Sequence, residues 1–142
     1  MTSDIYNPLY VDFDYYTDHL EEEDALYKKI RSNSEKISDI VFDENTPTII
    51  KSICQRFTLT DQQSALLSRL IRKILVAEVF IGDLIKELQG QLDLPPSKAQ
   101  ELADALAAEL FAPAKDELKE LHAKTFGGQQ PKQEGNVLNL KT

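Results

Sequence analysis

The chain has 142 residues, of which 42% are hydrophobic and 28% charged, with five glycines, six prolines and one cysteine. This composition suits one globular domain, and the scarcity of glycine and proline disfavours a sandwich or barrel, which needs many turns. The lone cysteine, Cys54, excludes an internal disulfide scaffold, and we expect it to be a small buried apolar residue.

The first 24 residues form a predicted acidic arm. They hold eight acidic residues and precede the first lysine, whereas the other 16 acidic residues are balanced by 16 basic ones, so the arm carries the whole formal net charge of −8. The opening residues have neither a basic start nor an apolar core, so we expect no signal peptide and a cytoplasmic protein. No apolar run approaches the roughly 20 residues that span a bilayer.

The arm is also rich in aromatic and acidic side chains that could contact a partner. These candidate partner-binding residues are Tyr6, Tyr10, Phe13, Tyr15, Tyr16, Glu21, Glu22 and Glu23. Exposed rings gain nothing in water, so two interpretations stay open. In the first, the rings pack onto the helical body and the acids face solvent. In the second, the arm docks onto a basic or groove-bearing partner.

The remaining chain predicts helices throughout, because apolar residues recur at helical spacing and no segment shows strand alternation. Serine, threonine and proline residues mark the helix starts, at Ser34, at Thr46-Pro47, at Thr60 with Gln63 in a capping box, and after Pro95-Pro96. The expected helices are Glu21 to Ile30, Ser34 to Phe42, Thr46 to Phe57, Thr60 to Phe80, Asp83 to Leu92, Ser97 to Phe111 and Ala114 to Phe126. We therefore predict an all-α, compact bundle of five to seven helices in residues 25–128.

Two stretches of the bundle resemble each other at an offset of 31 residues. Residues 75–80 read LVAEVF and residues 106–111 read LAAELF, and each is followed by a helix breaker and a further helix. Two stacked helix-joint-helix units would bury one another's apolar faces. Chance resemblance between leucine- and alanine-rich helices is the alternative.

The resemblance places a glutamate at the same position in each copy. On a helical wheel, Glu78 and Glu109 fall within the apolar face, so both are possible buried carboxylates. A buried carboxylate needs a lysine or arginine, a helix N-terminus or a raised pKa. Ordinary ion pairing, or simple exposure near a helix joint, is the interpretation that we favour for both. A metal site would need histidine three residues after a glutamate, and neither His19 nor His122 has that spacing, so we expect no metal and no cofactor.

The best basic cluster is Arg69, Arg72 and Lys73, which we expect to be the solvated face of a helix, so direct nucleic-acid binding is disfavoured. The tail, residues 129–142, is rich in glycine, glutamine and lysine and is expected to be flexible. Its apolar residues could form a short docking peptide, or an ordinary terminus; they are Val137, Leu138 and Leu140.

The sequence shows no phosphate loop, nucleophile elbow, paired-cysteine motif or zinc-binding histidine pair. It therefore favours a non-enzymatic protein-binding adaptor or assembly component that uses the arm and the tail. Alternatives are an acidic inhibitor or nucleic-acid mimic that occupies a basic site, a structural homo-oligomer subunit, and an enzyme using Glu78 and Glu109 with a metal.

Overall fold

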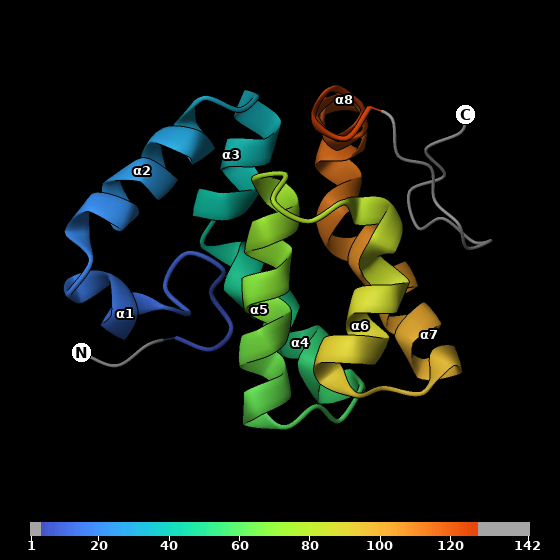
Figure 1. Ribbon diagram of the computed structural model, residues 1–142. Coiled ribbons are helices and arrows are strands. Elements are labelled where there is room, and N and C mark those ends of the chain that lie inside the picture. Colours follow the sequence, from blue (N-terminus) through green and yellow to red (C-terminus); the bar gives the residue numbers. More distant parts are fainter. Residues whose placement is uncertain (1–3, 128–142) are drawn as a thin grey trace.

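The computed structural model describes residues 4–127, and over this range every regular element is helical, as the sequence predicts (Figure 1). Seven helices of eight or more residues follow the one-turn helix α1 (Phe13–Thr17). They are α2 (Leu20–Arg31), α3 (Glu35–Phe42), α4 (Asn45–Arg56), α5 (Asp61–Leu75), α6 (Leu84–Leu92), α7 (Pro96–Leu106) and α8 (Lys115–Thr125). The chain is thus an all-α helical bundle.

Short turns of other helical types connect α5 to α6 and α7 to α8. A 3-10 turn, η1 (Ile81–Asp83), links α5 to α6, whereas a π-helical turn, η2 (Ala107–Phe111), and a second 3-10 turn, η3 (Ala112–Ala114), link α7 to α8. Helix α5 lies in the middle of the molecule, with α1 to α3 on one side of it and α6 to α8 on the other (Figure 1).

The core gathers apolar side chains from every helix between α2 and α8. Helix α5 contributes a continuous stripe at helical spacing, in which the side chains are at most 1% exposed: Leu67, Leu70, Ile71, Ile74 and Leu75. Each such side chain contributes about 1.5–3 kcal/mol by leaving water, so this stripe is a main reason the helices assemble around α5.

Two of the predicted helix starts are confirmed by their capping hydrogen bonds. The Ser34 hydroxyl accepts from the Ile37 N–H at 3.3 Å. The Thr60 hydroxyl accepts from the Gln63 N–H at 3.1 Å while the Gln63 side chain accepts from the Thr60 N–H at 2.9 Å, which completes a capping box. Each pairing satisfies backbone donors that have no partner within the helix.

Thr46 is not the N-cap that the sequence predicts. Helix α4 begins one residue earlier, at Asn45, and the buried Thr46 hydroxyl instead donates to the carbonyl of Ile40 at 2.6 Å. That carbonyl belongs to the last turn of α3, where carbonyls lack helical partners. Thr46 therefore closes the end of one helix from inside the next.

Helix α5 ends at Leu75, five residues before the predicted end at Phe80. The Glu78 N–H donates to the Lys73 carbonyl at 2.7 Å and the Ala77 N–H donates to the Ile74 carbonyl at 3.1 Å, with Ala77 at φ 59°. This is a Schellman ending, in which glycine is the usual left-handed residue. Because alanine stands there instead, the sequence lacks the ordinary stop signal.

The two similar stretches share an order of elements but not a backbone. Each unit runs helix, turn, helix, since α5, η1 and α6 are matched by α7, η2 with η3, and α8. The first stretch leaves the helix at Val76, whereas the second continues through the π-helical turn to Phe111. The two similar sequences therefore adopt different backbone conformations here. That they are two copies of one repeat stays a prediction.

Candidate functional site

The N-terminal segment, by which we mean residues 4–19 ahead of α2, is anchored to α5 by the carboxylate of Asp12. Asp12 accepts from the Nε and Nη2 atoms of Arg69, at 2.7 to 3.1 Å, and from Nη1 of Arg72 at 2.8 Å. The Arg72 side chain is 7% exposed and that of Asp12 is 17% exposed, so much of this three-residue cluster is shielded from water. Charge-assisted bonds of this kind are about twice as strong as neutral ones.

Opposing influences act on the Asp12 carboxyl. Burial disfavours its charged form, but the hydrogen bonds and positive charges of Arg69 and Arg72 outweigh burial and hold the pKa of Asp12 below its ordinary value. Asp12 is therefore ionised at neutral pH and holds the segment in place.

Backbone and apolar contacts extend this attachment. The Ser68 hydroxyl of α5 donates to the Ile5 carbonyl at 2.6 Å, and the side chains of Leu9 and Val11 are buried. Two rings also face cations of the body, since Lys51 lies 5.8 Å from the Tyr6 ring centre and Arg72 lies 5.9 Å from that of Tyr16. The inner side of the segment is therefore part of the folded body.

The structure accordingly corrects the expectation for the basic cluster. Arg69 and Arg72 do not form a solvated helix face, because the N-terminal segment covers them and Asp12 pairs with both. The partner lies 57 and 60 residues away along the chain, so no local sequence pattern could reveal the pairing.

The outer side of the same segment, continued by α2, carries exposed apolar side chains. Within residues 4–127, every exposed large hydrophobic side chain belongs to residues 10–42: Tyr10, Tyr15, Leu20 and Phe42. Leu20 is 65% exposed and Tyr15 is 46% exposed. We use the name outer surface for the side chains around Leu20 that line two adjoining hollows: Tyr15, Asp18, His19, Leu20, Glu21, Glu22, Glu23, Asp24, Tyr27 and Arg31.

Tyr15 is held in a defined orientation on this surface. Its ring stacks on the His19 ring, with centres 3.9 Å apart and planes 7° apart, and its hydroxyl donates to Glu22. That hydrogen bond to a carboxylate raises the pKa of the Tyr15 hydroxyl. The Nδ1 atom of His19 lies 2.7 Å from the Tyr15 carbonyl, which also ties α1 to the start of α2.

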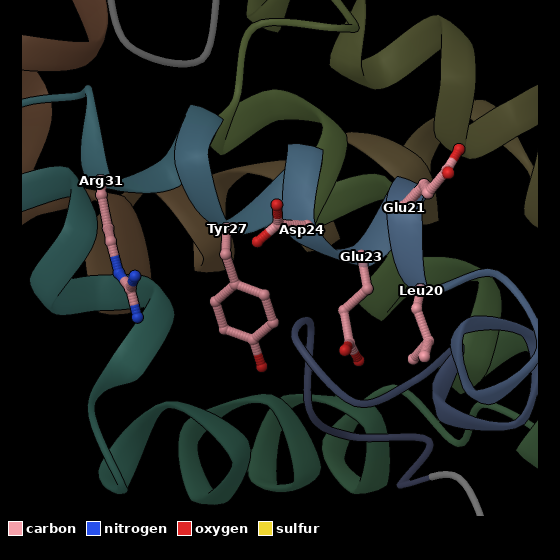
Figure 2. A pocket seen from close by; sticks show the side chains of 6 residues that line it. All are labelled: Leu20, Glu21, Glu23, Asp24, Tyr27 and Arg31. Carbon is pink, nitrogen blue, oxygen red and sulfur yellow. The ribbon is translucent and has the colours of Figure 1, made fainter.

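Helix α2 supplies the other half of the outer surface. Figure 2 shows Leu20, Glu23, Tyr27 and Arg31 projecting from one side of the helix, as their spacing of three, four and four residues requires. The Arg31 guanidinium lies 5.7 Å from the centre of the Tyr27 ring, and Tyr27 stacks with Phe42 at 6.2 Å. This side of α2 thus carries apolar, acidic and basic side chains next to one another.

The predicted arm residues separate into inner and outer sets. Tyr6 and Tyr16 pack against the core, and Phe13 is half-buried, whereas Tyr10 and Tyr15 are exposed. Glu21 and Glu22 are exposed and Glu23 is partly so. The predicted tail residues lie outside the described part of the chain: Val137, Leu138 and Leu140.

Sequence reasoning missed three apolar members of this region, namely Leu20, Tyr27 and Phe42. Two of them carried a signal, because Leu20 and Tyr27 stand seven residues apart on one helix face amid acidic residues. Phe42 lies at the end of α3 and meets Tyr27 only through the tertiary fold.

Glu78 and Glu109 do not lie in the core that the helical wheel suggests; both are ion-paired and partly exposed, which is the favoured interpretation of the sequence. The Glu78 side chain is 43% exposed and pairs with Lys29 at 3.4 Å, because α5 ends before it and the wheel no longer applies. The Glu109 side chain is 37% exposed and accepts two hydrogen bonds from Arg56, at 2.6 and 2.7 Å. These bonds lower the pKa of Glu109. Each glutamate therefore joins two elements as a surface ion pair.

A buried histidine of α8 packs against the segment that follows α5. His122 is 0% exposed, its Nε2 lies 2.8 Å from the Ile74 carbonyl and its Nδ1 accepts from the Ile81 N–H at 3.1 Å. A neutral ring that carries its proton on Nε2 satisfies both contacts. Burial lowers the pKa of His122, and the ring ties α8 to the segment after α5.

Other candidate chemistry can be placed briefly. Among residues 4–127 no three metal-ligating side chains come together, and Cys54 is buried, which raises the pKa of its thiol. No helix in that range has the length and apolar character needed to cross a bilayer.

The fold and the outer surface thus define an all-α bundle with an acidic, partly apolar face. Comparison with protein-family models, curated proteins and solved structures finds no match.

Proposed function

We propose that this chain is a non-enzymatic protein–protein interaction module whose contact surface is the outer surface of α1 and α2. One observation carries the proposal: the exposed large hydrophobic side chains of residues 4–127 all belong to residues 10–42, and two of them, Tyr15 and Leu20, lie on the outer surface. Large apolar groups that stay in water without packing are typical of contact sites.

The charge of this surface indicates the kind of partner. Asp18 and Glu21 make no ion pair or hydrogen bond through their carboxylates within the described chain, whereas Asp12 on the inner side is fully paired. Unpaired carboxylates at Asp18 and Glu21 make this part of the surface complementary to a basic one and would accelerate association. The exposed leucine and tyrosine favour a protein partner over simple mimicry of nucleic acid, which needs only negative charge.

Affinity purification from the native host with quantitative mass spectrometry tests this proposal. We expect Leu20→Ser to lower the amount of partner recovered by at least about tenfold, because removal of a central contact residue has an effect of that size. The matched control is Ala108→Ser, which changes another exposed position, on η2. Equal recovery by wild type and Leu20→Ser would refute the surface.

Two further measurements separate the alternatives. Binding that survives in 0.5 M salt indicates apolar contact, whereas binding that disappears indicates the acidic-inhibitor class, since salt screens charges beyond about 3–4 Å at that strength. Light scattering of the purified chain tests homo-oligomerisation. If the chain is a dimer and Leu20→Ser makes it a monomer, the molecule that occupies this surface is a second copy of the chain.

A further inference from the structure

The two hollows of the outer surface have nearly the same constituents. The Tyr27 hollow is lined by Leu20, Glu21, Glu23, Asp24, Tyr27 and Arg31. The Tyr15 hollow is lined by Tyr15, Asp18, His19, Leu20, Glu21 and Glu22. Each therefore has one tyrosine ring and three carboxylates, and they share the same exposed leucine and one glutamate.

The hollows differ in their remaining residue, which is Arg31 in the Tyr27 hollow and His19 in the Tyr15 hollow, so only the first holds a permanent cation. In the Tyr27 hollow, Arg31 supplies it, with the guanidinium 5.7 Å from the ring centre, and Lys28 pairs with Asp24 at 3.5 Å. The residues that line the Tyr15 hollow include neither lysine nor arginine. Glu22 accepts a hydrogen bond from the Tyr15 hydroxyl there, which leaves the carboxylates of Asp18 and Glu21 without a partner among residues 4–127.

We propose that the Tyr15 hollow binds an arginine or lysine side chain of the protein partner, next to an apolar partner side chain that packs on Leu20. The carboxylates of Asp18 and Glu21 would receive the cation beside the Tyr15 ring, an arrangement that the chain itself displays at Tyr27 and Arg31. This inference rests on the proposed function and adds the chemistry of the contact.

Several features prepare the hollow for such a ligand. The stacking on His19 and the bond to Glu22 fix the Tyr15 ring before binding, so little side-chain freedom remains to be lost. Leu20 is 65% exposed and lines both hollows, so an apolar side chain placed there lies beside the cation site. A basic residue adjacent to an apolar one is thus the minimal complementary segment.

The test titrates short blocked peptides into the full, ¹⁵N-labelled chain and follows backbone amide shifts. The first probe carries adjacent arginine and leucine between glycines, the second replaces arginine by uncharged citrulline, and the third replaces leucine by serine. We expect saturable shifts confined to residues 15–22 with the first probe, and affinities at least about threefold weaker with the other two.

Variants of the chain locate the cation. Asp18→Asn combined with Glu21→Gln should reduce the affinity for the arginine probe to that for the citrulline probe. The control Glu101→Gln, on an exposed part of α7, should change nothing. Circular dichroism establishes that each variant is folded.

The possible outcomes separate the inference from the proposed function. Equal binding of the arginine and citrulline probes, shifts confined to residues 23–31, or no shift with any probe would overturn the cation site. The proposed function would still stand if Leu20→Ser abolished partner recovery, and would fall if it did not.

Discussion

The inner and outer sides of the N-terminal segment have similar compositions and opposite environments. Asp12 on the inner side lies between two arginines, whereas Asp18, six residues later, has no partner for its carboxylate within residues 4–127. Val11 is buried and Leu20 is exposed. The comparison shows that one side of an acidic, aromatic segment can pack against the helical bundle while its other side stays exposed to solvent.

The largest expected effect is on the inner side. Asp12→Ala leaves Arg72 shielded from water without a counter-charge, so we expect a loss of about 2–3 kcal/mol in the free energy of unfolding. Asp18→Asn, on the outer side, should change it by less than about 0.5 kcal/mol. Urea unfolding of the two variants measures the difference, and similar stabilities would show that the anchoring is absent.

The buried His122 makes the stability of the folded chain depend on pH. Burial lowers the pKa of His122, so the unfolded chain binds a proton that the folded chain rejects, and stability is lost as pH falls below about 6.5. The slope should reach at most about 1.4 kcal/mol per pH unit for one proton.

Comparison of variants isolates the contribution of His122. His122→Gln should flatten the dependence of unfolding free energy on pH between 7.5 and 5, whereas the control Thr48→Val, at an exposed position on α4, should leave the wild-type slope. If both variants keep the full slope, His122 is not the responsible group. Urea unfolding at four or five pH values provides the measurement.

A threonine pair on α4 gives a smaller contrast. Thr46→Val removes the hydroxyl that donates to the Ile40 carbonyl, so a buried acceptor loses its partner and we expect a loss of about 1–1.5 kcal/mol. Thr48→Val, at an exposed position two residues away, should be nearly neutral. Thermal unfolding followed by circular dichroism distinguishes them, and equal melting temperatures would contradict this role for Thr46.

The smallest expected effect on stability is at the outer surface itself. Leu20→Ser should change the free energy of unfolding by less than about 0.5 kcal/mol, because the side chain is 65% exposed in the folded chain. A large destabilisation in urea would mean that Leu20 packs inside the fold and would remove it from the contact surface.

The parts of the fold that could be predicted depend on local chemistry. Ser34 and the Thr60–Gln63 pair form caps from neighbouring residues, and Pro95 and Pro96 occupy the N-cap and the first position of α7, so these boundaries follow from sequence. The end of α5 could not be predicted, because Ala77 takes the left-handed conformation that glycine usually signals. The helical wheel places Glu78 on the apolar face only if α5 continues past Leu75, which it does not.

The candidate site was predictable only in part, for a related reason. The acidic and aromatic residues are visible in the sequence, but their division into inner and outer sets depends on Arg69 and Arg72, which follow Asp12 by more than 50 residues. Long-range pairing of charges leaves no periodic pattern, so composition identified the segment while the fold determined which side chains remain exposed.

The most direct test of the account is a calorimetric titration of the partner recovered by affinity purification against three forms of the full chain. We predict that Leu20→Ser combined with Glu21→Gln weakens binding by at least about tenfold relative to wild type, while Glu101→Gln binds within about twofold of it. Equal affinity for all three forms would contradict the assignment of the outer surface as the place where this protein meets its partner.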